Sequence, residues 1–194
     1  MAKRAISRDD ILSMETYGAQ RKERRAALVQ KKKLRRVEVG PVATFYFESY
    51  DTMWHQVHEM LFIEKGGEAQ IEDELGAYNT LIPQGSELVA TVMFEIPDEA
   101  RRRAFLARLG GVEHRMFVEV AGQRVDGKSE ADVDRTTAAG KASSVQFVHF
   151  PLGAAAEAFK RPGTRVIVGI DHPAYSHMAV LSEDARAALA EDLE

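Results

Sequence analysis

Apolar and polar residues alternate most regularly between Glu87 and Ile96. Every second residue of this segment is apolar, namely Leu88, Ala90, Val92, Phe94 and Ile96. A period of two is typical of a strand with one buried face, because successive side chains point to opposite sides of a sheet. We therefore predict a strand over residues 87–96.

The same patterns predict further strands and, between them, helices. Strands are expected at residues 42–48, 112–120, 143–150 and 164–170. Helices are expected at residues 14–34, 52–65, 68–76, 97–109, 151–160 and 182–193. Residues 121–141 are polar and contain glycine, which predicts a long loop.

These elements favour an α+β fold. We expect a single domain at residues 41–194, in which helices pack on a mostly antiparallel sheet of about five strands. A basic helical N-terminal arm at residues 1–40 precedes it. A closed or half-closed barrel of the same strands is the alternative. No Gly-rich nucleotide motif follows a strand, so a Rossmann fold has little support.

Charge is distributed unevenly along the chain. Residues 1–40 contain 12 Lys and Arg and 5 Asp and Glu, a net charge of +7, so the remainder carries −11 and the whole chain −4. Such an arm can dock on an acidic partner; the cations expected to do so are Arg21, Arg24, Arg25, Lys32, Arg35 and Arg36. No aromatic residues interleave with these charges to stack on bases, which argues against nucleic acid. The alternative is a solvated helix, or one that packs on the acidic remainder.

The predicted helix 52–65 places a carboxylate among apolar residues. Its apolar stripe consists of Met53, Val57, Met60 and Leu61, and we expect this stripe to pack on the apolar face of the predicted strand 87–96. Glu64 falls in the middle of this stripe, and carboxylates are rarely buried without a partner. We expect Arg115 or Arg101 to pair with it, because Arg can bind both carboxylate oxygens. Alternatively, the helix bends near Gly66 and Glu64 reaches water.

The other side of this helix carries candidate metal ligands. His55, His58 and Glu59 are three or four residues apart, so they are neighbours on the helix surface. Such a group can present ligands to iron or manganese, as carboxylate–His helices do in di-iron bundles. No matching Glu-x-x-His motif occurs on a second helix, and a solvated polar face is the alternative.

Two predicted strands share the spacing Thr-x-x-x-Glu. Thr44 precedes Glu48, and Thr91 precedes Glu95, each by four residues. If the two strands are neighbours, their polar side chains can line one pocket. Burial would raise the pKa values of the carboxylates there, and a nearby Arg would keep them ionised. The alternative is that these faces point to solvent.

A third candidate is the segment from Asp171 to Tyr175. Loops at strand ends often carry functional side chains, and His172 is available there as a base or ligand. The proline that follows it favours a turn whatever the function. Together the strands, helix and loop define a candidate pocket: Glu48, Glu59, Glu64, Glu95, His172 and Tyr175.

Composition excludes several kinds of chemistry. The chain has no Cys, which removes disulfides, thiolate nucleophiles and iron–sulfur ligation. No apolar run approaches the roughly 20 residues of a membrane span, and no apolar region follows the charged N-terminus. We therefore expect a cytoplasmic protein with no membrane contact. The sequence is compatible with a homo-oligomer.

Several segments together resemble a bacterial family known only as a domain of unknown function. The resemblance rests on Gly40-Pro41, Gln56–Leu61, Tyr78-Asn79, Ser144–Phe147 and Asp171-His172-Pro173 with Tyr175. It covers nearly the whole chain. At His55 and His58 the family usually has an aromatic residue and Gln, which argues against these two as obligatory ligands.

The resemblance implies a setting rather than an activity. Members of that family are often encoded beside rubrerythrin-like proteins and iron–sulfur oxidoreductases. We therefore favour an accessory or interaction protein of a bacterial redox or peroxide-response system. The alternative is a metal- or ligand-dependent enzyme that uses the carboxylate and His pocket.

Overall fold

The computed structural model describes residues 3–130 and 141–194, and in these residues nine strands form two antiparallel sheets. The first has the order β1 (Arg36–Val39), β2 (Ala43–Phe47), β3 (Glu87–Phe94), β7 (Val145–Pro151), β6 (Lys128–Ser129). The second has the order β5 (Gln123–Asp126), β4 (Met116–Val120), β8 (Val166–His172), β9 (Tyr175–Val180). The predicted α+β fold is confirmed, with two open sheets in place of a single sheet or a barrel.

The larger core lies between the two sheets. It receives the predicted apolar face of β3, including Leu88, Ala90 and Val92, which are at most 1% exposed. Phe45, Phe47 and Phe150 meet there with ring centroids 6.3–6.5 Å apart. The period-two pattern therefore identified the side of β3 that faces the second sheet.

The predicted loop at 121–141 instead begins with two short strands. β5 ends at Asp126 in one sheet, and β6 begins at Lys128 in the other. A Cβ atom at Gly127 would lie 2.4 Å from a methyl carbon of Val148, so this crossing requires glycine. The strands are too short for a clear alternation, and residues 131–140 lie outside the described part of the chain.

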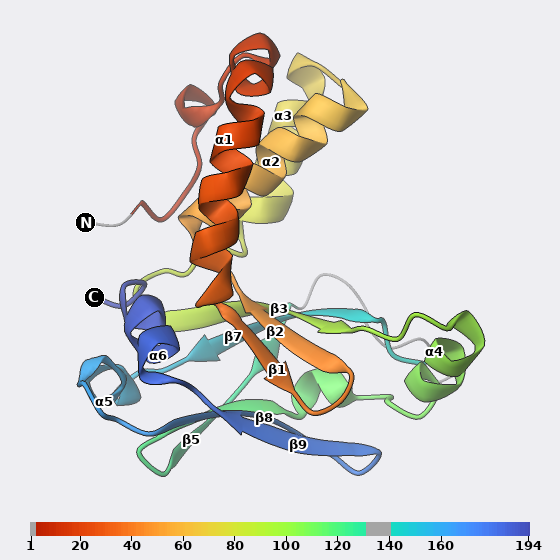
Figure 1. Ribbon diagram of the computed structural model, residues 1–194, viewed down its shortest axis with the longest axis vertical. Coiled ribbons are helices and arrows are strands. Elements are labelled where there is room, and N and C mark those ends of the chain that lie inside the picture. The colour runs from red at the N-terminus through yellow and green to blue at the C-terminus, as the bar shows by residue number, and fades with distance from the viewer. Residues whose placement is uncertain (1–2, 131–140) are drawn as a thin grey trace.

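Three helices stand together on the free side of the five-stranded sheet (Figure 1). They are α1 (Met14–Lys33), α2 (Tyr50–Glu64) and α3 (Glu68–Asn79), close to the predicted bounds. A second, smaller core forms among them from Ile6, Met53, Val57, Leu61, Ile71, Leu75, Leu81, Ile82 and Val89. Helix α2 thus packs on the Val89 side of β3. Our prediction that it packs on the Leu88 side was wrong, because the second sheet covers that face.

The remaining helices lie at the ends of the sheets. Helix α4 (Glu99–Leu106) lies near one end, and α5 (Ala155–Lys160) and α6 (Glu183–Ala190) lie near the other (Figure 1). After α6 the chain pairs with the segment before β3, through a parallel bridge between Leu193 and Gly85. None of the described helices combines the length and apolar character that a membrane span requires.

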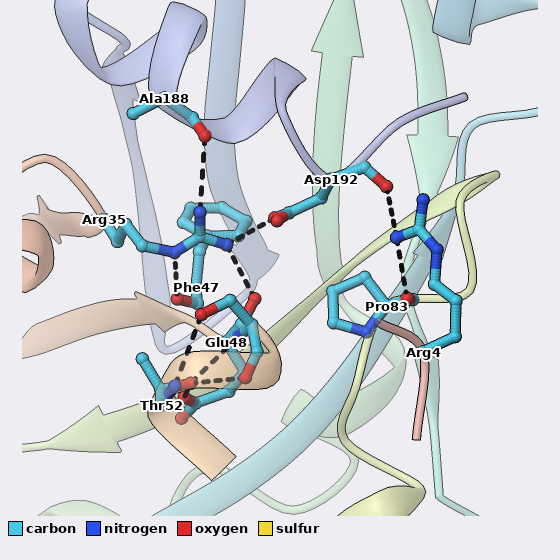
Figure 2. A network of polar contacts seen from close by, with 9 residues as sticks. Arg4, Arg35, Phe47, Glu48, Thr52, Pro83, Ala188 and Asp192 are labelled. Atoms are coloured by element: carbon cyan, nitrogen blue, oxygen red, sulfur yellow. Dashed lines mark hydrogen bonds and ion pairs between the residues drawn. The ribbon is translucent and has the colours of Figure 1, made fainter. Parts of the chain in front are cut away.

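Arg35 joins these parts. Its guanidinium donates to the backbone oxygens of Phe47 and Glu48 at 3.0 and 2.7 Å, and to that of Ala188 in α6 at 3.3 Å (Figure 2). It also forms an ion pair with Asp192. Arg35 is 8% exposed, so it is not available to the partner-binding surface in which we had placed it.

The end of the proposed N-terminal arm is therefore integrated in the sheet. Residues 36–39, which we had assigned to the arm at 1–40, form strand β1 and pair with β2. The sequence signal for this strand is weak, because only Val37 and Val39 alternate before Gly40 begins the turn. The helical part of the arm, α1, packs on α2.

We expect Leu61→Ala to lower the free energy of unfolding by ~2–5 kcal/mol, because it removes a side chain that is 3% exposed and leaves a cavity. Ile63, two residues later on the same helix, is 62% exposed and provides the control. Ile63→Ala should change the stability by no more than about 0.5 kcal/mol. Urea unfolding of both variants measures the difference, and equal losses would contradict the assignment of this face.

Arg35→Met should lower the free energy of unfolding by about 3–5 kcal/mol, because it strands a buried carboxylate and three backbone oxygens. Arg36→Met is the matched control, since Arg36 is exposed and its ion pairs and its contact with the Tyr46 ring lie at the surface. Asp192→Asn should cost less than Arg35→Met, because Arg35 keeps its bonds to the carbonyl groups. Chemical denaturation of the three variants tests this order, which equal effects of Arg35→Met and Arg36→Met would contradict.

Candidate functional site

The two Thr-x-x-x-Glu segments do lie side by side, and each threonine binds the glutamate of the other strand. β2 and β3 run antiparallel with Tyr46 opposite Thr91 and Thr44 opposite Met93. The Thr91 hydroxyl donates to Glu48 at 2.6 Å, and the Thr44 hydroxyl donates to Glu95 at 2.6 Å. The antiparallel register therefore separates the two carboxylates along the sheet, and they do not share one pocket.

Glu48 lies at the floor of a pocket of about 390 Å³ between the sheet and the helices. Glu48 lies in the chain between β2 and α2, and it is only 7% exposed. The Thr52 hydroxyl, in the first turn of α2, donates to the second carboxylate oxygen at 2.6 Å. The rest of the lining comes from both layers: Lys32, Tyr46, Met53, Gln56, Tyr78, Leu81, Thr91, Met93, Val145 and Phe147.

Glu95 lies further along the same face of the sheet and is exposed. It accepts hydrogen bonds from Thr44 and, at 2.9 Å, from Tyr46. The Arg36 guanidinium lies 3.8 Å from the same carboxylate and stacks over the Tyr46 ring. Glu95 is thus a surface group, connected to the Glu48 pocket only through the Tyr46 side chain.

Glu59 belongs to a separate polar cluster between α1 and α2. Arg21 donates to its two oxygens at 2.8 and 2.7 Å, and the buried Tyr17 hydroxyl donates to it at 2.6 Å. His55 contacts the same hydroxyl at 3.1 Å. The bonds from Arg21 lower the pKa of Glu59 to about 2, while burial and the neighbouring Glu59 raise the pKa of Tyr17.

The second histidine of this helix is a structural residue. His58 is 0% exposed, accepts a hydrogen bond from the Leu12 backbone at 3.1 Å and donates to the Trp54 carbonyl at 2.7 Å. Its ring stacks on Trp54 with centroids 3.7 Å apart. Burial lowers the pKa of His58, which favours its neutral form. Neither ring nitrogen is left for a metal.

The predicted metal ligands accordingly do not converge. His55 and Glu59 share a hydrogen-bonding cluster with Tyr17, but His58 points into the packing around Trp54. Within residues 3–130 and 141–194, no group of three or more His, Asp or Glu side chains is arranged to hold a metal ion. The structure therefore does not identify a site for iron or manganese in these residues.

Glu64 is exposed, and the prediction that it pairs with a cation was wrong. Its carboxylate accepts a hydrogen bond from Gln70 at 2.7 Å. Helix α2 ends at Glu64, and the next residue, Lys65, has a left-handed φ of 57°. The apolar stripe of the helix therefore no longer faces the core at Glu64. Both expected partners are exposed residues elsewhere in the fold: Arg101 lies in α4, and Arg115 directly precedes β4.

His172 and Tyr175 stabilise the turn between β8 and β9. His172 accepts a hydrogen bond from Ala174 and contacts the Gly110 carbonyl, at 3.1 and 3.2 Å. The Tyr175 hydroxyl donates to the Val39 carbonyl at 2.6 Å and accepts from two backbone amides of the β1–β2 turn. Tyr175 thus fixes the second sheet to the first, His172 ties the turn to the segment after α4, and neither residue lines the Glu48 pocket.

The basic residues of the arm have different surroundings. Arg21 pairs with Glu59, and Arg24 lies over the Trp54 ring at 4.7 Å. Arg36 contacts Glu38 and Glu95. Arg25 and Lys32 are exposed. Of the six predicted docking residues, Arg25 and Lys32 are the two that form no ion pair or ring contact within the described part of the chain.

Sequence reasoning missed the polar residues that complete the Glu48 pocket. In the sequence, Thr52 is only the first residue of a predicted helix, and Gln56 and Tyr78 belong only to segments that carry the family resemblance. The amide of Gln56 donates to the Tyr78 hydroxyl at 3.4 Å across α2 and α3. No local pattern brings these helices over Glu48, because their position depends on the packing of the smaller core.

We expect Glu59→Gln to lower stability near neutral pH and to have progressively less effect between about pH 4.5 and pH 2. The folded-state pKa of Glu59 is about 2, below its ordinary value of 4.5, so the stability from its charged form is lost as the pH falls through this window. Urea midpoints of both proteins across this range provide the measurement. Glu64→Gln is the control, and a constant difference for Glu59→Gln would contradict the role of its charge.

Comparisons with known proteins identify a family but give no activity. Among solved structures, the chain is similar to one described as a novel protein of unknown function from Burkholderia pseudomallei K96243. The two share 39% sequence identity and a TM-score of 0.90, over 98% of this chain and 100% of that chain. No curated protein matches the chain. Residues 5–193 match the family described as Protein of unknown function (DUF3501), and the chain therefore belongs to this family.

Proposed function

We propose that this protein is an accessory interaction protein that binds an acidic protein partner through the solvent face of α1. The observation that carries the proposal is a stripe on that helix, formed by Lys22, Arg25, Val29 and Lys32. The spacing of three, four and three residues places them on one side of the helix. All four are exposed. We call this set the basic stripe.

The charges of the basic stripe are not neutralised by the fold. Arg21 and Lys31 pair with Glu59 and Asp51, whereas the three cations of the stripe have no ion pair within the described residues. Unpaired surface cations accelerate association with an acidic surface and orient it. Val29 is 48% exposed among them and offers an apolar contact at the centre. This combination is better suited to a protein partner than to a small anion.

The family resemblance suggests which acidic partner to test. Its members are often encoded beside rubrerythrin-like and iron–sulfur proteins, so we propose a cytoplasmic redox or peroxide-response partner of this kind. The alternative, a metal- or ligand-dependent enzyme, stays a prediction. Of its candidate residues, Glu48 is the buried carboxylate that lines a pocket together with other polar side chains.

The double variant Lys22→Glu/Arg25→Glu should weaken binding to the rubrerythrin-like protein of the same host about tenfold or more, because two attractive contacts become repulsive. Titration calorimetry at low salt measures the affinity, and the wild-type affinity should fall as salt is added. Arg161→Glu/Arg165→Glu is the matched control, since it makes the same change of charge at exposed residues outside α1.

Two results would refute this proposal. One is the absence of a complex at low salt with either a rubrerythrin-like or an iron–sulfur partner. The other is an equal loss of affinity in both double variants, which would show that only the net charge of the protein matters. A loss confined to the α1 variant would support the basic stripe as the docking surface.

A further inference from the structure

We infer that the Glu48 pocket binds a small organic ammonium ion, with the Glu48 carboxylate as its counterion. The inference rests on a buried carboxylate that no cation of the described chain neutralises, at the floor of a pocket with aromatic walls. It does not depend on the docking role of α1. The two proposals therefore fail separately.

The first observation is the surroundings of the Glu48 carboxylate. Its oxygens accept one hydrogen bond each, from Thr91 and Thr52, both at 2.6 Å. Two hydroxyl donors leave acceptor capacity unused, because a carboxylate can accept about four hydrogen bonds. A buried charge that is hydrogen-bonded but not paired with an opposite charge is energetically costly. A cationic ligand would supply the missing charge.

The neighbouring cations do not fill this role. Arg35 contacts Glu48, but its guanidinium donates to the backbone oxygen of that residue and forms its ion pair with Asp192. Lys32 lines the pocket, yet it is exposed and makes no ion pair with Glu48. Among the residues that the structure describes, the carboxylate thus has no ion-pair partner.

The second observation is the chemistry of the walls. Tyr46 and Tyr78 contribute aromatic rings with hydroxyl groups, and Phe147 contributes a third ring. Aromatic faces attract organic cations, and the sulfur-containing side chains of Met53 and Met93 adapt to an apolar body. The Gln56 amide and the Tyr78 hydroxyl offer further hydrogen bonds near the opening. An ammonium group on an aromatic or aliphatic body matches this lining.

The third observation is size and sign. A volume of about 390 Å³ is within the range of pockets for small organic molecules. A carboxylate at the floor disfavours anionic ligands, because like charges repel strongly where water is excluded. Metal ions are not the expected ligand, because the Glu48 oxygens already accept hydrogen bonds from Thr52 and Thr91. The lining also provides no second carboxylate. The pocket is thus selective for a protonated amine.

The test is titration calorimetry of the full chain with three amine probes: 2-phenylethylamine, agmatine and putrescine. At least one should bind with 1:1 stoichiometry, and Glu48→Gln should weaken it about tenfold or more through loss of the charge-assisted contact. Glu87→Gln is the matched control, because Glu87 is a half-buried carboxylate on the neighbouring strand β3 that pairs with His149 outside this pocket. The affinity of Glu87→Gln for the amine should equal that of the wild type.

A second variant and a second probe keep the result independent of folding. Gln56→Trp on the surface of α2 should block the opening and abolish binding without removing Glu48, and thermal melts verify that each variant is folded. The anion 3-phenylpropionate has the same ring as 2-phenylethylamine and should not bind. The inference is overturned if no amine binds at concentrations up to about 10 mM, if the anion binds equally well, or if folded Glu48→Gln retains full affinity.

Discussion

The arrangement of this protein depends on the buried guanidinium of Arg35. It follows α1 and precedes β1, and it binds the backbone where β2 becomes α2, together with α6 and Asp192 near the C-terminus. A planar guanidinium with five donors is suited to such a junction, because it can satisfy several carbonyl groups and a carboxylate at once. This junction holds the start of α2, where the carbonyl oxygen of Glu48 is one of the acceptors, and the smaller core holds the rest of the helix above the sheet.

The junction also explains why polar chemistry gathers on one side of the molecule. The second sheet covers one face of the five-stranded sheet, and this face consists mainly of apolar side chains, with the buried Gln146 among them. The helices cover only part of the opposite face, where Val89 and Phe147 contribute to their core. The uncovered part retains Thr44, Tyr46, Thr91 and Glu95, and the Glu48 pocket forms at the boundary between the covered and uncovered parts.

Helix α1 connects the two proposed binding surfaces. One side of α1 packs on α2 through Tyr17, Leu28 and the Arg21–Glu59 pair. The other side carries the basic stripe, whose last residue, Lys32, also lines the Glu48 pocket. A partner bound along the stripe would therefore stand next to a ligand in the pocket. This proximity offers a physical route by which a small molecule and a protein partner could influence each other.

The sequence by itself determined the local elements and the kinds of residue that matter. The alternation in 87–96 identified β3 and its buried face, the patterns at 14–34, 52–65 and 68–76 located α1, α2 and α3, and the repeated Thr-x-x-x-Glu spacing marked four residues that do form hydrogen bonds. Only the tertiary structure decided that each threonine serves the opposite strand, that Arg35 is buried, that Glu64 reaches water and that His58, His172 and Tyr175 are structural. Periodicity reports which side of an element is apolar. It does not report which element covers that side, in what register, or where a helix end turns a side chain to solvent, because these depend on contacts between residues far apart in the chain.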